Sequence, residues 1–279
     1  FKVMSSFSIN ILFSYLINQV SQNLYTVIIG KFQSSTFLGY YRLAYKIKEA
    51  PVSGINAIVL STSYPIISRE KDRSKRERYY ETLLKNFLFL HFPLILVLVG
   101  IANPLISILL GQKWVMSVYY LQLMLIASAF IPLMTVNANI AKITGNSKLY
   151  RNLGFLRAGL STIALLLTMK KSIPVILYGQ IIATYISVGF DILFCGKLID
   201  LNWRKQLSIT ANQFWVPFVS MLLSSIITKG ITSNIIHLSL FILFFSSCYI
   251  IVNEVIRLDT YMVLRNKVMT KLRKRSFIG

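Results

Sequence analysis

Five polar or charged side chains lie on one face of an apolar segment between residues 39 and 59. They follow one another at intervals of four, three, four and three residues, the spacing of one helical face: Arg42, Lys46, Glu49, Ser53 and Asn56. Arginine and lysine bind anions through charge-assisted hydrogen bonds, and hydroxyl and amide groups hydrogen-bond neutral polar groups. Pro51 lies within the stripe and is expected to bend the helix. The pattern therefore predicts a polar cavity beside a bent helix.

Similar polar stripes recur in three other apolar segments. Segment 8–30 carries Ser14, Asn18, Gln22 and Tyr25, segment 174–196 carries Gln180, Thr184, Ser187 and Asp191, and segment 115–141 carries Gln122, Ser128, Thr135, Asn137 and Asn139 around Pro132. Ionisable groups inside a membrane are costly when they face lipid, so they normally face a bundle interior or water. The stripes together predict a hydrated cavity lined by cations.

Some of these residues also have interpretations that involve no ligand. Asn and Gln at helix interfaces often act only as interhelical hydrogen-bond donors and acceptors, which is the alternative for the face that holds Asn18 and Gln22. Arg42 is close enough to the outer membrane boundary to extend its guanidinium to lipid headgroups. Both interpretations stay open at the level of sequence.

The two acids within these segments have alternatives of the same kind. Lys46 and Glu49 are neighbours on the stripe and are able to neutralise each other. Asp191 has Lys197 as a potential partner at the inner boundary. An acid that only balances a nearby lysine would contribute charge neutrality and no transport chemistry.

The elements that carry the stripes are predicted to be transmembrane helices. Hydrophobic residues make up 55 % of the 279, and the mean hydropathy is +0.62. A spanning helix needs roughly 20 mostly apolar residues. Eight segments fit, at 8–30, 43–66, 86–109, 115–141, 155–170, 174–196, 213–229 and 232–256. The fold class is therefore all-α, a polytopic membrane protein with about eight spans.

Two local features refine this plan. Pro93 and Pro104 predict that segment 86–109 is broken near its outer end, with a short piece that dips back into the membrane. The charged stretch 68–85 mixes both signs at helical spacing, which predicts an amphipathic helix along the membrane surface, or else a solvated connector.

The basic residues indicate the orientation of the chain. Net charge is +21, and with a cytoplasmic N-terminus 22 of the 30 basic residues fall on the cytoplasmic side and 8 on the other. This asymmetry follows the positive-inside rule and places both termini in the cytoplasm. The excess charge is thereby explained without nucleic-acid binding. The basic tail RNKVMTKLRKRSF is expected to lie along anionic lipid headgroups.

Enzyme chemistry finds little support. Cys195 and Cys248 lie in apolar runs and read as small hydrophobic residues. His91 and His237 are too few and too far apart for a metal or catalytic site. The outer loops are short, and no nucleophile or zinc motif is present. No cofactor and no metal are predicted.

Several short motifs, in order, resemble a known family. They are GKF at residues 30–32, LGYYRLAYKIKEAP at 38–51, SYPIISREKD at 63–72, LLGQKW at 109–114 and NANIAKITGNS at 137–147. They are similar to the second half of Wzx-type polysaccharide flippases, in the MOP superfamily that also holds the MATE exporters and the lipid II flippase MurJ. The similarity runs through residues 24–160.

The resemblance implies a domain organisation. Members of this family have fourteen helices in two pseudosymmetric lobes, with both termini in the cytoplasm. Residues 1–200 would then form the second six-helix lobe, and residues 201–279 a transmembrane hairpin with a basic cytoplasmic tail. The absence of an initiator Met suggests that the sequence begins within a longer protein.

The resemblance also implies a substrate, an oligosaccharide on an undecaprenyl diphosphate carrier. It would move from the inner to the outer leaflet of the bacterial cytoplasmic (inner) membrane by alternating access. Lys46 is the first choice for the diphosphate, Arg42 the second, and Lys48 the third because it points off the stripe. The residues expected to meet sugar hydroxyls are Ser53, Asn56, Asn18, Gln22 and Gln180, and the ion-coupling candidates are Glu49 and Asp191.

Two other functions and a set of partners remain to be considered. A MATE-like ion-coupled antiporter of small molecules is the main alternative, and a membrane enzyme acting on the same glycans is a third. Partners that the resemblance implies are the lipid-linked oligosaccharide, membrane lipids, and a polysaccharide polymerase and glycosyltransferases.

Overall fold

The chain is built almost entirely from long helices. The computed structural model describes the backbone of residues 2–70, 72–199 and 201–276, and their side chains except at 2–7, 22, 64, 66, 73, 267–269 and 271–276. Over these ranges there is no strand. The elements are α1 Lys2–Phe32, α2 Ser35–Arg69, α3 Arg73–Leu110, the 3₁₀ turn η1 Gln112–Trp114, α4 Met116–Ser128, α5 Ile131–Ile143, α6 Ser147–Thr168, α7 Ile173–Gly196, α8 Trp203–Ile227, α9 Asn234–Ile256 and α10 Asp259–Ser276. The all-α prediction is confirmed.

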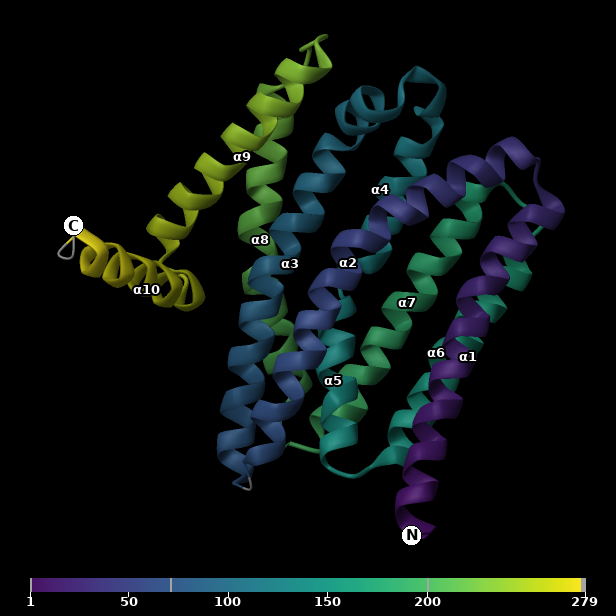
Figure 1. Cartoon of the computed structure of the whole chain (residues 1–279), viewed down its shortest axis with the longest axis vertical. Coiled ribbons are helices and arrows are strands. Elements are labelled where there is room, and N and C mark those ends of the chain that lie inside the picture. Colours follow the sequence, from purple (N-terminus) through teal and green to yellow (C-terminus); the bar gives the residue numbers. More distant parts are fainter. Residues whose placement is uncertain (1, 71, 200, 277–279) are drawn as a thin grey trace.

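Six helical stretches of the described chain are long and apolar enough to cross a membrane. They are Ser35–Arg69, Ser74–Leu110, Met116–Ile143, Ile173–Gly196, Trp203–Ile227 and Asn234–Ile256. α1 and α6 lie beside them in the same bundle (Figure 1), at two of the eight positions where the sequence predicts spans. The chain is a multi-pass membrane protein.

From α1 to α9 successive helices run in opposite directions along the bundle, except that α5 continues in the direction of α4 (Figure 1). The connections at 32–35, 110–116, 168–173 and 227–234 lie at one end, and those at 69–73, 143–147 and 196–203 lie at the other, beside the start of α1. The basic stretch 69–85 begins at this second end. α10 turns away from α9 and projects from the bundle (Figure 1).

Two groups of helices pack side by side. α1 packs along α6, α6 along α7, and α7 against α4 and α5, which also contact α2. α3 packs against α8 and α9. Close approach depends on small residues, since a Cβ on Gly154 of α6 would come 2.0 Å from the Ser14 hydroxyl oxygen of α1. α1 and α6 therefore pack with almost no space between their backbones at this point.

α3 is continuous, so the break expected from Pro93 and Pro104 is wrong. Its 38 residues include both prolines and residues 73–85 of the charged stretch, so this part of the stretch is neither a separate surface helix nor a connector. At 1.5 Å per residue it spans about 57 Å, longer than a bilayer core, so its charged start extends beyond the membrane. Pro93 leaves the Phe89 carbonyl without its helical donor, and the Tyr249 hydroxyl of α9 donates to that oxygen at 3.3 Å. The neighbouring helix thus offsets the lost hydrogen bond.

The membrane-crossing stretch Met116–Ile143 is interrupted where α4 ends and α5 begins. Pro132 lies in the first turn of α5, where its missing N–H costs least. The Ser128 carbonyl, four residues earlier, receives a hydrogen bond from Nε2 of the fully buried His91 at 3.0 Å. The Tyr185 hydroxyl donates to the Ile126 carbonyl at 2.9 Å. Side chains of α3 and α7 therefore stabilise the interruption.

Candidate functional site

A cavity of about 620 Å³ lies among α1, α2, α4, α5, α6 and α7. Its polar lining residues are Tyr15, Asn18, Ser21, Tyr25, Tyr41, Tyr45, Lys48, Glu49, Ser53, Asn56, Ser128, Thr135, Asn139, Lys142, Tyr150, Arg157, Ser161, Gln180, Thr184 and Ser187. No residue of α3, α8 or α9 is among them. The polar stripes of four segments thus meet at one void between the helices.

Six of the ten site residues selected from the sequence line this cavity. They are Asn18, Lys48, Glu49, Ser53, Asn56 and Gln180. Arg42 and Lys46 instead line a second cavity of about 450 Å³, together with Trp114. Glu49 lines both cavities. The side chain of Gln22 lies outside the described residues, and Asp191 is buried behind the wall of the larger cavity.

Lys48 faces the larger cavity although the sequence placed it off the stripe. Its ammonium lies 2.9 Å from the Glu49 carboxylate and 4.5 Å from the centre of the Tyr45 ring. The neutralisation considered for Lys46 and Glu49 is therefore made by Lys48. In the first part of α2 the face toward the cavity runs through Tyr41, Tyr45 and Lys48, one residue before the charged stripe, whereas beyond Pro51 the stripe residues Ser53 and Asn56 line the cavity themselves. α2 changes direction along its length, as expected of a helix that contains Pro51 (Figure 1).

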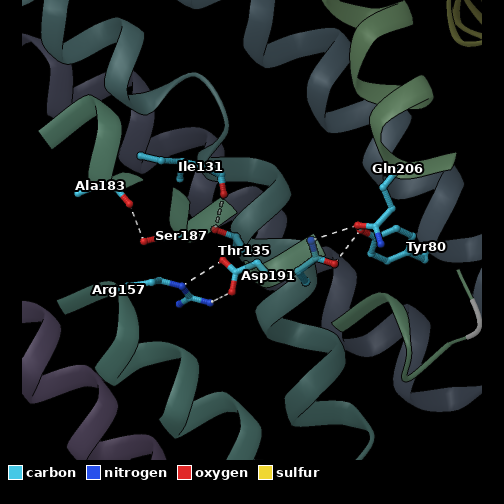
Figure 2. Close-up of polar contacts among 9 residues, drawn as sticks. Tyr80, Ile131, Thr135, Arg157, Ala183, Ser187, Asp191 and Gln206 are labelled. Carbon is cyan, nitrogen blue, oxygen red and sulfur yellow. Dashed lines mark hydrogen bonds and ion pairs between the residues drawn. The ribbon is translucent and has the colours of Figure 1, made fainter. Parts of the chain in front are cut away.

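Arg157 of α6 also lines the cavity. It is one of the 22 basic residues that the charge pattern assigned to the cytoplasmic side, and no binding role was predicted for it. Figure 2 shows its guanidinium in a two-point contact with Asp191 of α7. Nε donates to Oδ2 at 3.1 Å and Nη2 to Oδ1 at 2.7 Å. Asp191 is thus paired with Arg157 and not with Lys197. The sequence could have identified Arg157 as a cavity residue, because Tyr150, Arg157 and Ser161 follow one another at the spacing of one helical face.

Amide and hydroxyl groups of the lining also connect the helices. The Thr135 hydroxyl of α5 lies 2.6 Å from Asn56 Oδ1 of α2, and Asn139 Nδ2 donates to the Ser63 hydroxyl oxygen at 2.6 Å. Asn18 donates within its own helix, to the Ser14 carbonyl at 2.8 Å. The interhelical role considered for amides therefore applies to Asn56 and Asn139, both of which are among the residues that line the cavity.

Asn137 belongs to a separate buried junction with Tyr80 and Gln206, the two residues labelled at the right of Figure 2. The Tyr80 hydroxyl of α3 lies 2.9 Å from Asn137 Oδ1 and 2.9 Å from Gln206 Oε1 of α8, and Asn137 Nδ2 lies 3.3 Å from the same Gln206 oxygen. All three side chains are fully buried. A phenol has one proton, so it donates to one oxygen at a time. The junction joins α3, α5 and α8 away from the cavity.

The described side chains contain no group of three or more His, Cys, Asp or Glu residues that could hold a metal ion. What the larger cavity offers is cations, amides, hydroxyls and the rings of five tyrosines. These groups bind anions and polar, hydroxyl-rich molecules.

Comparison with known proteins relates the chain to proteins of polysaccharide biosynthesis. A family model described as "Polysaccharide biosynthesis protein" matches residues 1–119. The chain is 29 % identical over 231 residues to the teichuronic acid biosynthesis protein TuaB of Bacillus subtilis, which is 81 % of this chain and 47 % of TuaB. It is 26 % identical over 110 residues to the lipopolysaccharide biosynthesis protein WzxC of Escherichia coli, 39 % of this chain and 22 % of WzxC. The resemblance to the Wzx type is thereby confirmed.

The extent of these matches limits what they transfer. The chain spans about half the length of TuaB and less of WzxC. No solved structure matches the chain. Residues 1–119, which the family model matches, include all of α1 and α2 and hence their contributions to the cavity.

Proposed function

We propose that this protein is a flippase for oligosaccharides linked to undecaprenyl diphosphate, moving them from the inner to the outer leaflet of the bacterial cytoplasmic membrane. The observation that supports it most is the cavity of about 620 Å³ between helices of a membrane protein, lined by both cations and hydrogen-bonding groups. A lipid-linked glycan needs such a path because its headgroup is charged and hydroxylated while its tail is apolar.

The lining groups suit the two parts of that headgroup. Arg and Lys form charge-assisted hydrogen bonds with phosphate oxygens. Asn18, Ser53, Asn56 and Gln180 are available for sugar hydroxyls, and tyrosine offers an apolar ring with a polar tip. The polyprenyl tail remains in the bilayer.

The size of the cavity favours a second enclosing part. Its volume lies within the roughly 300–1,000 Å³ of pockets for single small molecules, whereas the proposed substrate joins several sugars to a diphosphate and a lipid. We therefore assign residues 1–200 to one lobe of a two-lobed transporter, with 201–279 as an added hairpin. A facing lobe would complete the chamber and alternate its access between the two sides.

Orientation and coupling follow from the charges. The end of the bundle that holds the 69–73 and 143–147 connections would be cytoplasmic, together with both termini, because it carries most of the basic residues. Glu49, on the boundary of both cavities, is the first candidate for ion coupling, and Asp191 the second. Glycosyltransferases would build the substrate before this step, and a polysaccharide polymerase would act on it afterwards.

The test is genetic and biochemical. In the native host, deletion of the gene should abolish the surface polysaccharide and leave lipid-linked repeat units in the inner leaflet, and the complete protein should restore export. Surface polysaccharide is measured by immunoblot, and the sidedness of the lipid-linked units by their accessibility in intact spheroplasts. Normal export in the deletion strain, combined with increased sensitivity to drugs, would refute the proposal and favour an antiporter.

A further inference from the structure

Two cations, Lys142 of α5 and Arg157 of α6, line the larger cavity. Lys142 lies in the last turn of α5, and Tyr150 and Arg157 lie on one face of α6. The Lys142 ammonium is 4.6 Å from the centre of the Tyr150 ring. Both cations are among the 22 basic residues that the charge pattern assigned to the cytoplasmic side, and in the fold both line the cavity.

The charge of the lining is unbalanced at Lys142. Four ionisable Lys, Arg, Asp or Glu side chains line the cavity: Lys48, Glu49, Lys142 and Arg157. Lys48 is paired with Glu49, and Arg157 with Asp191. Within the part of the chain whose side chains are described, no carboxylate lies within ion-pair distance of Lys142. The excess positive charge is therefore at Lys142, where an anion would be stabilised.

Arg157 is held in an orientation that leaves part of its guanidinium available. Nε and Nη2 donate to Asp191, whereas Nη1 donates to no described group. The Asp191 side chain is 0 % exposed and that of Arg157 is 16 % exposed, so the carboxylate lies behind the guanidinium as seen from the cavity. Asp191 is thus a positioning residue, because a guanidinium fixed before binding loses less entropy when a ligand arrives.

Lys142 has to move toward Arg157 for both cations to contact one diphosphate, whose two phosphates are adjacent. Tyr150 and Arg157 are seven residues apart, about 10.5 Å along the helix axis. Lysine has a flexible four-carbon stem, so the ammonium is able to leave the tyrosine ring and approach Arg157. One phosphate would then meet the fixed guanidinium and the other the mobile ammonium.

We propose that Lys142 and Arg157 form the binding site for the diphosphate of the substrate; this rests on the proposed function. Lys46 and Arg42 lie in the other cavity. The site lies near the 143–147 connection, at the end of the bundle assigned to the cytoplasm, where a substrate made in the cytoplasm would enter.

The experiment measures binding to the purified complete protein in detergent. The probes are undecaprenyl diphosphate, undecaprenol, inorganic pyrophosphate and phosphatidylglycerol. The variants are Lys142→Gln and the double variant Arg157→Gln with Asp191→Asn, which removes both charges of the buried pair together. Lys148→Gln is the matched control for Lys142→Gln, because Lys148 is exposed in the first turn of α6 and its loss changes the net charge equally, whereas the double variant leaves the net charge unchanged.

We expect Lys142→Gln and the double variant each to weaken binding of undecaprenyl diphosphate and of pyrophosphate at least about tenfold, the loss of one charge-assisted contact. Lys148→Gln should stay within about twofold of the wild type. Undecaprenol should bind all four proteins equally. Thermal unfolding of each variant establishes that it is folded.

The outcomes separate the inference from the proposed function. Wild-type protein that binds undecaprenyl diphosphate no better than undecaprenol would refute the proposed substrate itself. Strong wild-type binding that both variants retain would overturn only the assignment of Lys142 and Arg157. An equal loss of phosphatidylglycerol binding would also overturn it, since the pair would then recognise a membrane lipid headgroup.

Discussion

Arg157 on α6 and Asp191 on α7 are joined by two hydrogen bonds, of 3.1 and 2.7 Å, and this pair forms part of the cavity wall. Asp191 is completely buried, whereas Arg157 reaches the cavity. Breaking a buried ion pair by removing one partner is strongly destabilising, but replacing both partners by neutral groups often costs little. The pair therefore combines a structural role with a position suited to ligand binding.

The first prediction follows from this asymmetry. Arg157→Gln leaves a fully buried carboxylate without its cation and should destabilise the protein by about 3–5 kcal/mol, whereas Asp191→Asn leaves a partly hydrated guanidinium and should cost less. The double variant should recover most of the loss. Unfolding of the purified protein in detergent is measured for the wild type and all three variants. Simple addition of the two single effects in the double variant would show that the pair is not energetically coupled.

The second prediction concerns His91, whose Nε2 lies 3.0 Å from the Ser128 carbonyl at the interruption between α4 and α5. His91→Leu leaves that carbonyl buried without a donor and should cost about 1–3 kcal/mol. His91→Gln retains an N–H donor of similar reach and should cost less. Both variants are compared by thermal unfolding. Equal destabilisation would indicate that the shape of the imidazole matters more than its hydrogen bond.

The third prediction concerns the contact between α3 and α9. A Cβ on Gly100 would lie 2.0 Å from the Phe241 ring, and Phe241 is buried, so Gly100→Ala should cost about 1–3 kcal/mol. Gly159→Ala is the control, because no atom lies within 4 Å of its added Cβ. There the alanine should be neutral or stabilise the helix by up to about 1 kcal/mol. A tolerated Gly100→Ala would mean that α9 is free to move away from α3.

Much of the fold was predictable from hydropathy. The predicted segments coincide with the long helices, and their alternation agrees with the positions of the connections in Figure 1. The prediction failed for α3, where local proline rules do not include donors from other helices, such as the Tyr249 hydroxyl. Helix propensity considers the residues of one helix only. It cannot include this hydrogen bond, because the donor lies 160 positions away in the sequence.

The cavity was predictable in kind but not in detail. Converging polar stripes indicated a shared void, and Asn18 and Gln180 do line one. The orientation of α2 was misjudged because charges were weighted more heavily than tyrosines, although Tyr41 and Tyr45 define the face toward the cavity. Arg157 was missed because it lies near a predicted membrane boundary, where a basic residue is normally explained by orientation alone.

The last prediction separates the two cavities by their lysines. Lys48 faces the larger cavity and neutralises Glu49, whereas Lys46 lines the smaller one. Lys48→Gln removes a cation and leaves the Glu49 carboxylate, with 45 % of its side chain exposed, to repel an anionic substrate. We expect polysaccharide export to fall about tenfold or more in Lys48→Gln, the effect of roughly 1.4 kcal/mol, and much less in Lys46→Gln.

The double variant Lys48→Gln with Glu49→Gln tests the cause of that loss. It removes the repelling carboxylate together with the lysine, so export should recover in part if charge balance in the larger cavity is what matters. Surface polysaccharide is compared in strains with equal amounts of each protein in the membrane. Greater loss in Lys46→Gln than in Lys48→Gln would place the substrate path in the smaller cavity, along the stripe of Arg42 and Lys46.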